Sequence, residues 1–169
     1  MKISLDAIDI EILRHLQQDA SLGNQALAAR VHTSPATCLR RVRALQDSGV
    51  IARQVAVLDP GVLATQFGHG ISAIVEITLE RQTAEALAQF ENSVLPEPCV
   101  QQCYRVSPGP DFILVVHCSD MPAYQALSQR LFTANALVRN IKAFFSIQRS
   151  KFGAELPLPA PQGTLQTTG

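Results

Sequence analysis

The sequence contains no tryptophan, only two tyrosines, and no surplus of charge of either sign. Fourteen basic and fourteen acidic side chains cancel to a formal net charge of zero. The longest strongly apolar run, residues 112–116, is far shorter than the roughly 20 residues that a helix needs to cross a bilayer. No basic segment followed by an apolar one opens the chain, so we predict a cytoplasmic protein without a secretory signal.

Cysteine is also scarce, and four cysteines are too few to form a disulfide framework in 169 residues. Cys99 and Cys103 fall on one predicted strand, about 13 Å apart, which is too far for a disulfide or a shared zinc ion. We expect Cys38, Cys99, Cys103 and Cys118 to be reduced thiols. No metal-ligand or phosphate-loop spacing appears, so no metal, cofactor or catalytic residue is predicted.

The charge that is present is unevenly distributed. Residues 30–53 contain five arginines against one aspartate, which gives this segment a charge of +4. Residues 59–169 contain seven basic and nine acidic side chains, a charge of −2. A basic segment within a neutral globular protein is the electrostatic footprint expected of a nucleic-acid-binding surface.

The first 50 residues show the periodicity of three short helices. Apolar side chains recur at helical spacing over residues 5–18, over 25–31 and again from Pro35 onward. The helix ends carry suitable residues: Asp6 with Asp9 in a capping box, Asn24, Ser34 and, in the left-handed conformation, Gly49. A small turn between the second and third helices completes a helix-turn-helix, and the aliphatic segment 51–58 is predicted to follow as a strand.

The third helix carries the strongest functional signal. We predict that Leu39, Val42 and Leu45 are buried, which leaves three arginines on the remaining arc. In a helix-turn-helix, the N-terminal end of this helix meets base edges, and arginines bind phosphates or guanine. The predicted DNA-facing residues are Ser34, Ala36, Thr37, Arg40, Arg41 and Arg43. The alternative is a solvated arginine face on a structural or protein-binding helix.

The second half alternates with the period of strands and helices in the order β-α-β-β-α-β, which is the ferredoxin-like arrangement. The predicted strands cover residues 70–80, 99–106, 111–118 and 138–149, and the predicted helices cover 83–95 and the segment after Asp120. We therefore divide the chain into a helix-turn-helix domain (1–58), a linker (59–69), a βαββαβ domain (70–152) and a flexible tail (153–169). The ELPLP start of the tail could instead dock on a neighbour.

Two stretches, LDAIDIEILRHLQQDASLGNQALAARV and SPATCLRRVRALQDSGVIARQVAVLDP, resemble the Lrp/AsnC family of leucine- and asparagine-responsive transcription regulators. The resemblance covers about residues 5–152. It implies an α+β protein with an N-terminal winged helix-turn-helix and a C-terminal ferredoxin-like βαββαβ domain for effector binding and oligomerisation. It also implies double-stranded DNA as a partner, homodimers or octamers, and amino-acid effectors. The family's most typical arginine corresponds to Arg41.

The resemblance places an effector loop at residues 107–112. The family pattern is threonine-glycine, two residues, aspartate and an aromatic residue, but here the glycine is displaced by one position and two prolines remove N–H donors. The predicted effector-binding residues are Ser107, Gly109, Asp111, Phe112 and Phe144. We expect any effector to be less polar, or to be more weakly held, than a free polar amino acid. The alternative is a stiff β-turn in which Asp111 fixes the backbone.

Two other functions remain open at this point. Some tetrapyrrole decarboxylases resemble this two-domain fold, but they need histidines in the cleft, and the second half offers only His69 and His117. A small-molecule-binding protein without DNA binding would not need the arginines. We predict a sequence-specific DNA-binding transcription regulator that is not an enzyme and is modulated by an amino acid or a related metabolite.

Overall fold

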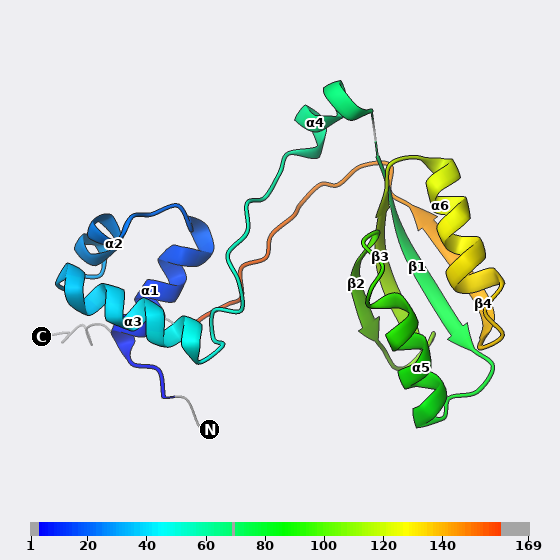
Figure 1. The fold of residues 1–169 in the computed structure, drawn as a ribbon, viewed down its shortest axis with the longest axis horizontal. Coiled ribbons are helices and arrows are strands. Elements are labelled where there is room, and N and C mark those ends of the chain that lie inside the picture. Colours follow the sequence, from blue (N-terminus) through cyan, green and yellow to red (C-terminus); the bar gives the residue numbers. More distant parts are fainter. Residues whose placement is uncertain (1–3, 69, 160–169) are drawn as a thin grey trace, which may run out of the picture. The chain divides into compact units, whose positions relative to one another are not determined.

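The computed structural model describes residues 4–68 and 70–159, and the chain forms two compact units. One unit consists of the chain up to Val57 together with the chain from Lys151 onward, and the other consists of Leu58–Ser150. Figure 1 shows their elements in chain order. Among the described residues, no helix is both long and apolar enough to cross a membrane.

The first unit contains the three predicted helices, α1 (Ala7–Gln18), α2 (Asn24–Arg30) and α3 (Pro35–Asp47). The capping box is confirmed: the Asp9 N–H donates to Asp6 at 2.9 Å, and the Asp6 N–H donates to Asp9 at 3.2 Å. Gly49 has a φ of 76°, the predicted left-handed conformation. Asn24 is not the cap of α2, because Gly23 occupies that position.

The core of the first unit brings all three helices together. Its buried side chains are Ile12, Leu13, Leu27, Ala28, Val31, Cys38 and Leu45. The prediction that Leu39 is buried is wrong, since its side chain is 40% exposed. Cys38, one helical step away, takes the buried position, and Leu39 joins the outer face of α3.

The segment after α3 differs from the prediction in two ways. Residues 51–58 form no strand in the described chain, and Val55 and Val57 are exposed. Their β-branched composition suits a strand, but a strand also needs a neighbour for its N–H and C=O groups. The predicted linker contains a helix, α4 (Pro60–Phe67), whose first N–H groups donate to the Asp59 carboxylate. The Asp-Pro start is a helix signal that the flanking glycines obscured.

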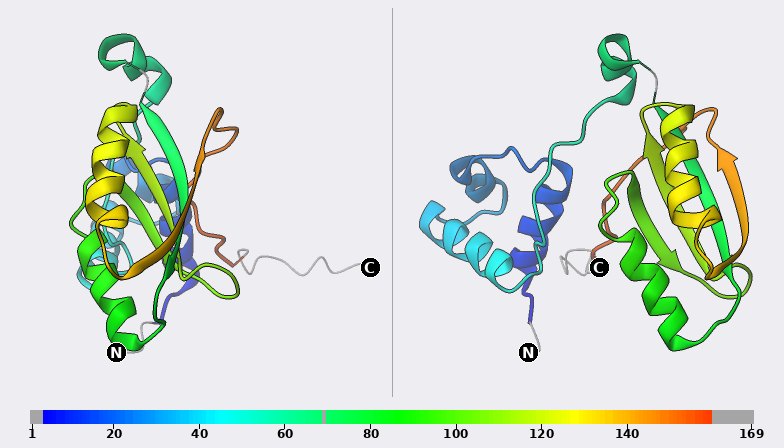
Figure 2. Two further views of the ribbon diagram at one scale, coloured as in Figure 1. Left: turned by 90° about the vertical axis from the view of Figure 1, so that its right-hand side faces the viewer. Right: turned by 45° about the vertical axis from the view of Figure 1, so that its right-hand side comes forward.

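The second unit confirms the ferredoxin-like prediction. Its strands are β1 (Ile71–Leu79), β2 (Val100–Arg105), β3 (Phe112–Cys118) and β4 (Val138–Phe145), and they pair antiparallel in the order β2-β3-β1-β4. Two helices, α5 (Ala84–Val94) and α6 (Met121–Ser128), cover one face of the sheet, as Figure 2 shows. A π-helical turn, Gln129–Thr133, continues α6.

The two faces of this sheet have different surroundings. On the helix-covered face, alternate residues of β1 and β3 form the core, including Val75, Ile77, Phe112 and Leu114. On the other face, which we call the open face, the paired strands present Ile74, Tyr104, Ile113, Val115 and Phe144. Three of these, Ile74, Tyr104 and Phe144, are about half exposed. No described element of the second unit covers them.

The described start of the predicted tail lies against the first unit. Leu156, Leu158 and Pro159 contact the first unit, where Leu158 packs against its core. Residues of the predicted tail from 160 onward lie outside the described residues. The segment lacks a helical or strand periodicity, but docking of an extended chain requires neither.

Candidate DNA interface and effector site

The N-terminal end of α3 is fixed by a small hydrogen-bond network. The Ser34 hydroxyl accepts from the Thr37 N–H at 3.2 Å and donates to the Thr37 hydroxyl at 2.9 Å. The Asn24 side-chain amide donates to the Pro35 carbonyl at 2.8 Å, which ties the start of α2 to the start of α3. Ser34 and Ala36 are exposed at this end, so another molecule can approach the backbone and side chains of both residues.

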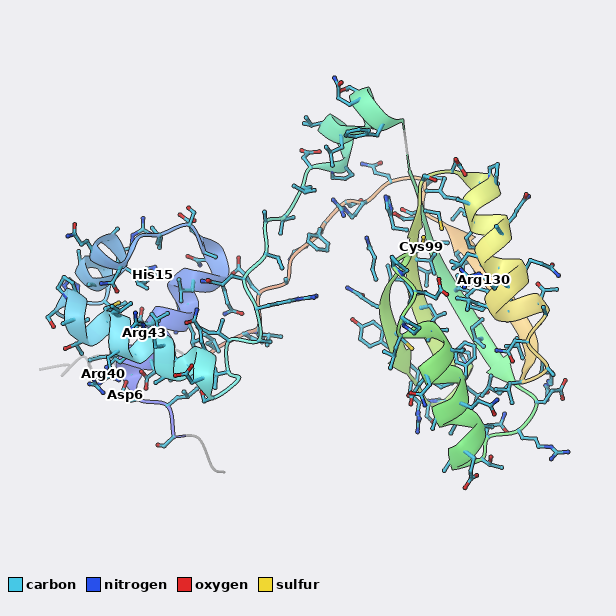
Figure 3. All side chains as sticks on the ribbon, viewed as in Figure 1. Asp6, His15, Arg40, Arg43, Cys99 and Arg130 are labelled. Carbon is cyan, nitrogen blue, oxygen red and sulfur yellow. The ribbon has the colours of Figure 1, made fainter. Side chains whose placement is uncertain are left out.

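The outer face of α3 carries two unpaired cations beside an apolar side chain. Ala36, Leu39, Arg40, Arg43, Ala44 and Asp47 line one shallow depression on this face. Arg40 and Arg43 project from it (Figure 3), and within residues 4–68 and 70–159 neither forms an ion pair. Leu39 is an exposed side chain of this face that the sequence analysis missed, because an apolar residue at helical spacing was assigned to the core.

Arg41 lies in a different environment from Arg40 and Arg43. Its Nη1 donates to Asp6 Oδ2 at 2.7 Å and to Asp9 Oδ1 at 2.8 Å, so it joins α3 to the capping box of α1. The hydrogen bonds that Arg41 donates to Asp9 and Asp6 raise the pKa of Arg41. The hydrogen bond from the Asp9 N–H, followed by the one from Arg41, lowers the pKa of Asp6. The guanidinium predicted to face DNA is therefore committed to two carboxylates of its own unit.

The turn between α2 and α3 places a non-glycine residue in the left-handed region. His32 has a φ of 50°, and the following Thr33 N–H donates to the Ala28 carbonyl at 3.0 Å. A left-handed conformation costs an L-residue other than glycine about 1–2 kcal/mol. The turn that orients α3 thus contains local strain.

The predicted effector loop lies between β2 and β3. Ser107 and Gly109 are exposed, and Gly109 has a φ of 119°, a conformation that favours glycine. Asp111 Oδ2 accepts from the Leu79 N–H at 2.7 Å and from the Gln82 amide at 3.4 Å. One carboxylate oxygen of Asp111 thus fixes the end of β1 rather than the backbone of its own turn, which the β-turn alternative predicts.

The structure does not bring the predicted effector residues together. Phe112 is fully buried, with its ring centroid 4.8 Å from that of Phe90, so the prediction that it contacts an effector is wrong. Phe112 begins β3 opposite Ile77, so the pleat turns it onto the helix-covered face. Phe144 pairs with Ile74 on the open face and is 54% exposed. Ser107, Gly109 and Asp111 remain together in one loop.

The His117 ring and the thiols of the second unit contact other groups of the fold or are partly buried in it. The His117 ring accepts from or donates to the Ser72 hydroxyl through Nδ1 at 2.9 Å, and His69 lies outside the described residues. All four thiols are free, and burial followed by a hydrogen bond with Cys99 raises the pKa of Cys118 to about 11. The described part of the chain gathers no group of three metal-ligating side chains.

Comparisons with known proteins match both domains. The AsnC-type helix-turn-helix domain matches residues 5–46, and the Lrp/AsnC ligand binding domain matches residues 72–156. An uncharacterised HTH-type transcriptional regulator of Haemophilus influenzae is 38% identical over 148 residues, which are 88% of this chain and 86% of the relative.

Two solved structures are similar in fold and sequence. An AsnC family transcriptional regulator from Agrobacterium tumefaciens is 34% identical, with a TM-score of 0.79 over 90% of this chain and 97% of that one. A transcriptional regulator from Neisseria meningitidis, solved as its L-Met complex, is 29% identical, with a TM-score of 0.77 over 91% and 97%. These matches favour a transcription regulator over a decarboxylase-like enzyme. The chain belongs to the Lrp/AsnC family of helix-turn-helix transcription regulators.

Proposed function

We propose that a dimer of this chain binds double-stranded DNA with two-fold symmetry through the outer face of α3. Arg40 and Arg43 contact phosphates or guanine, Ser34, Ala36 and Thr37 approach the backbone and base edges, and Leu39 contacts a thymine methyl group. Arg41 is a positioning residue, because it holds α3 against α1. Binding to chromosomal DNA places the protein in the cytoplasm.

The observation that carries this proposal is the different pairing of three neighbouring arginines. Arg41 is bound by two carboxylates, whereas Arg40 and Arg43 extend without an ion pair in the described chain from α3, whose N-terminal end is exposed and capped by the Ser34 hydroxyl. Two unpaired guanidinium groups one helical turn apart suit neighbouring phosphates of a groove wall. A solvated arginine face would also leave its charges unpaired, so the salt dependence of DNA binding decides between the two.

The test is a salt titration of DNA affinity on the wild type and three variants. Each phosphate contact contributes about −0.9 to the slope of log K against log salt, so Arg40→Ala or Arg43→Ala, present twice in a dimer, reduces the slope by about 1.8. Arg81→Ala, an exposed arginine of the second unit, removes the same charge and leaves the slope unchanged. If Arg81→Ala matches Arg40→Ala, binding depends on net charge alone and the interface is wrong.

We further propose that the dimer forms through the open face of the sheet. A half-exposed cluster of Ile74, Tyr104 and Phe144 beside Ile113 and Val115 is a contiguous apolar surface of the kind that marks protein interfaces. Phe144→Asp should shift the sedimentation coefficient from dimer to monomer at micromolar concentration. The control is Leu95→Asp, an exposed leucine after α5, which should stay dimeric; a dimeric Phe144→Asp protein would exclude this face.

The ligand-binding domain, we propose, takes an apolar amino acid at the 107–111 loop. The relative from Neisseria meningitidis was solved with L-Met, and the prolines at 108 and 110 leave few N–H donors for a more polar ligand. Asp111 has a second carboxylate oxygen for the ligand's ammonium group. A thermal-shift screen should rank methionine and leucine above asparagine and glutamate.

The matched variant for the effector site is Asp111→Asn. Its amide oxygen still accepts from the Leu79 N–H, so the end of β1 stays in place, while the negative charge is lost. We expect an unliganded Tm near that of the wild type and no shift with methionine. An undiminished methionine shift would show that the ammonium group binds elsewhere.

A further inference from the structure

The C-terminal segment makes a set of backbone contacts with α1. The N–H of Leu156 donates to Gln17 Oε1 at 2.7 Å, and the Leu156 carbonyl accepts from Gln17 Nε2 at 3.2 Å. One glutamine amide therefore satisfies both backbone groups of one residue. Three residues further on, the Pro159 carbonyl accepts from the Arg14 guanidinium at 2.6 Å. Gln17 and Arg14 are three residues apart, about one helical turn, so their side chains lie on the same face of α1.

Side-chain burial along the segment is selective. Leu158 is partly buried against the core of the first unit, where Leu16 and Val42 also pack, whereas Leu156 is 71% exposed. The contact with the first unit thus involves the backbone of Leu156 and the side chain of Leu158. A random collapse of an apolar tail would bury both leucines, because both are equally hydrophobic.

The sequence of this segment suits docking without secondary structure. Prolines at 157 and 159 fix φ and lack an N–H group, so the segment has few donors to satisfy and little conformational entropy to lose. Proline-rich segments are recognised for this reason on helical and aromatic surfaces. Glu11 pairs with Arg14 beside the contact, which holds the guanidinium in position for Pro159.

We propose that this face of α1 is a docking site for residues 155–159 of the same chain, so that the C-terminal segment is an integral part of the DNA-binding unit. The chain leaves that unit after Val57 and re-enters it at Lys151. A DNA-binding unit attached through both connections has less orientational freedom than one attached through a single linker. For the DNA part, this inference rests on the proposed function; for docking and stability, it stands alone.

The first experiment compares the full chain with two truncated chains. A chain ending at Pro159 keeps the docked segment, and a chain ending at Phe152 lacks it. We expect the first to melt like the full chain and the second to show a Tm of the DNA-binding unit lowered by several degrees. A capped synthetic peptide of residues 153–159 should restore that Tm in the shorter chain and shift the NMR resonances of Arg14 and Gln17. Equal Tm values for both truncations would overturn the proposal.

Point variants separate docking from the effect of chain length. Gln17→Ala and Leu158→Asp should lower the Tm as the shorter truncation does, while Leu156→Ala should not, because only its backbone is used. If Leu156→Ala and Leu158→Asp behave alike, the contact is non-specific and the dock is refuted. If the wild-type chain binds no DNA while the variants still show these Tm differences, the proposed function is refuted and the docking of the segment is supported.

A mixing experiment tests whether the segment comes from the same chain. The chain ending at Phe152 keeps the docking face of α1 but lacks the C-terminal segment. The Leu158→Asp variant keeps the docking face, but its own segment cannot dock. A third protein, Gln17→Ala, supplies a competent segment and a weakened dock. Co-refolded dimers of the Phe152-terminated chain and Gln17→Ala should melt as the average of the two. A restored Tm would show docking between copies and overturn the same-chain assignment.

Discussion

Removing the Arg41 guanidinium should unfold the DNA-binding unit more readily without removing a DNA contact. The Asp6 carboxylate is 53% exposed, so its pair with Arg41 contributes about 0.5 kcal/mol, as exposed ion pairs do. The Asp9 carboxylate is only 15% exposed, and its charge-assisted bond to Arg41 contributes about 1–2 kcal/mol after partial screening by solvent. Arg41→Ala therefore lowers the free energy of unfolding by about 2 kcal/mol.

The predicted loss is large for a unit of this size. Small domains lose about 4–8 °C of Tm for each kcal/mol, so the Tm should fall by about 8–16 °C. At a temperature where the variant is still folded, its affinity for DNA and its salt slope should equal those of the wild type. The matched variant Arg40→Ala should show the opposite result, with an unchanged Tm and a reduced slope.

A double-mutant cycle identifies the partner. Arg41→Ala and Asp9→Ala together should destabilise the unit by less than the sum of the single changes, with a coupling energy of about 1 kcal/mol or more. Thermal melts of the four proteins measure it directly. If Arg41→Ala leaves the Tm unchanged and reduces the salt slope as Arg40→Ala does, the guanidinium contacts DNA and the structural assignment is wrong.

Three further outcomes follow from the backbone and the charges. The pKa of Asp6 is lowered from 3.8, so its share of stability is complete above that pH and is lost as the pH falls through the lowered value; acid titration of the Tm should show this loss, and Arg41→Ala should reduce it. His32→Gly should raise stability by about 0.5–1 kcal/mol, because glycine accepts its positive φ, and an unchanged or lower Tm would refute strain in the turn. Gly109→Ala should cost about 1–3 kcal/mol in thermal melts, although its added Cβ meets no atom within 4 Å; a neutral result would contradict the required φ.

The sequence predicted the elements whose cause is local. The capping box of Asp6 and Asp9, the Ser34 cap followed by Pro35, and the alternation along 71–79 each depend on neighbouring residues, and the structure confirms them. The prediction was wrong where the structure of a segment depends on a partner that is distant in the sequence. Residues 51–58 have the composition of a strand but no neighbouring strand in the described chain, and residues 156–159 have no periodicity yet find a surface on α1.

The roles of adjacent arginines could not be predicted from composition. Successive residues on a helix point about 100° apart, so Arg40 and Arg41 belong to different faces of α3 although they are neighbours in sequence. Which face meets the Asp6 and Asp9 carboxylates depends on how α1 crosses α3, which no residue pattern within α3 records. The change from Leu39 to Cys38 in the core adds Leu39 to the outer face, while Leu45 stays buried as predicted.

In the effector loop, some positions of the family motif stabilise the fold and others are exposed. Within residues 107–112, Phe112 is buried on the helix-covered face and half of the Asp111 carboxylate fixes the end of β1, so these positions are needed for folding whether or not a ligand binds. Gly109 takes the positive φ directly, which explains why the glycine stands one position later than the family pattern when Pro108 occupies the usual site. At the effector site proposed above, selectivity is therefore expected to come from Ser107 and the second oxygen of Asp111 rather than from the aromatic residue.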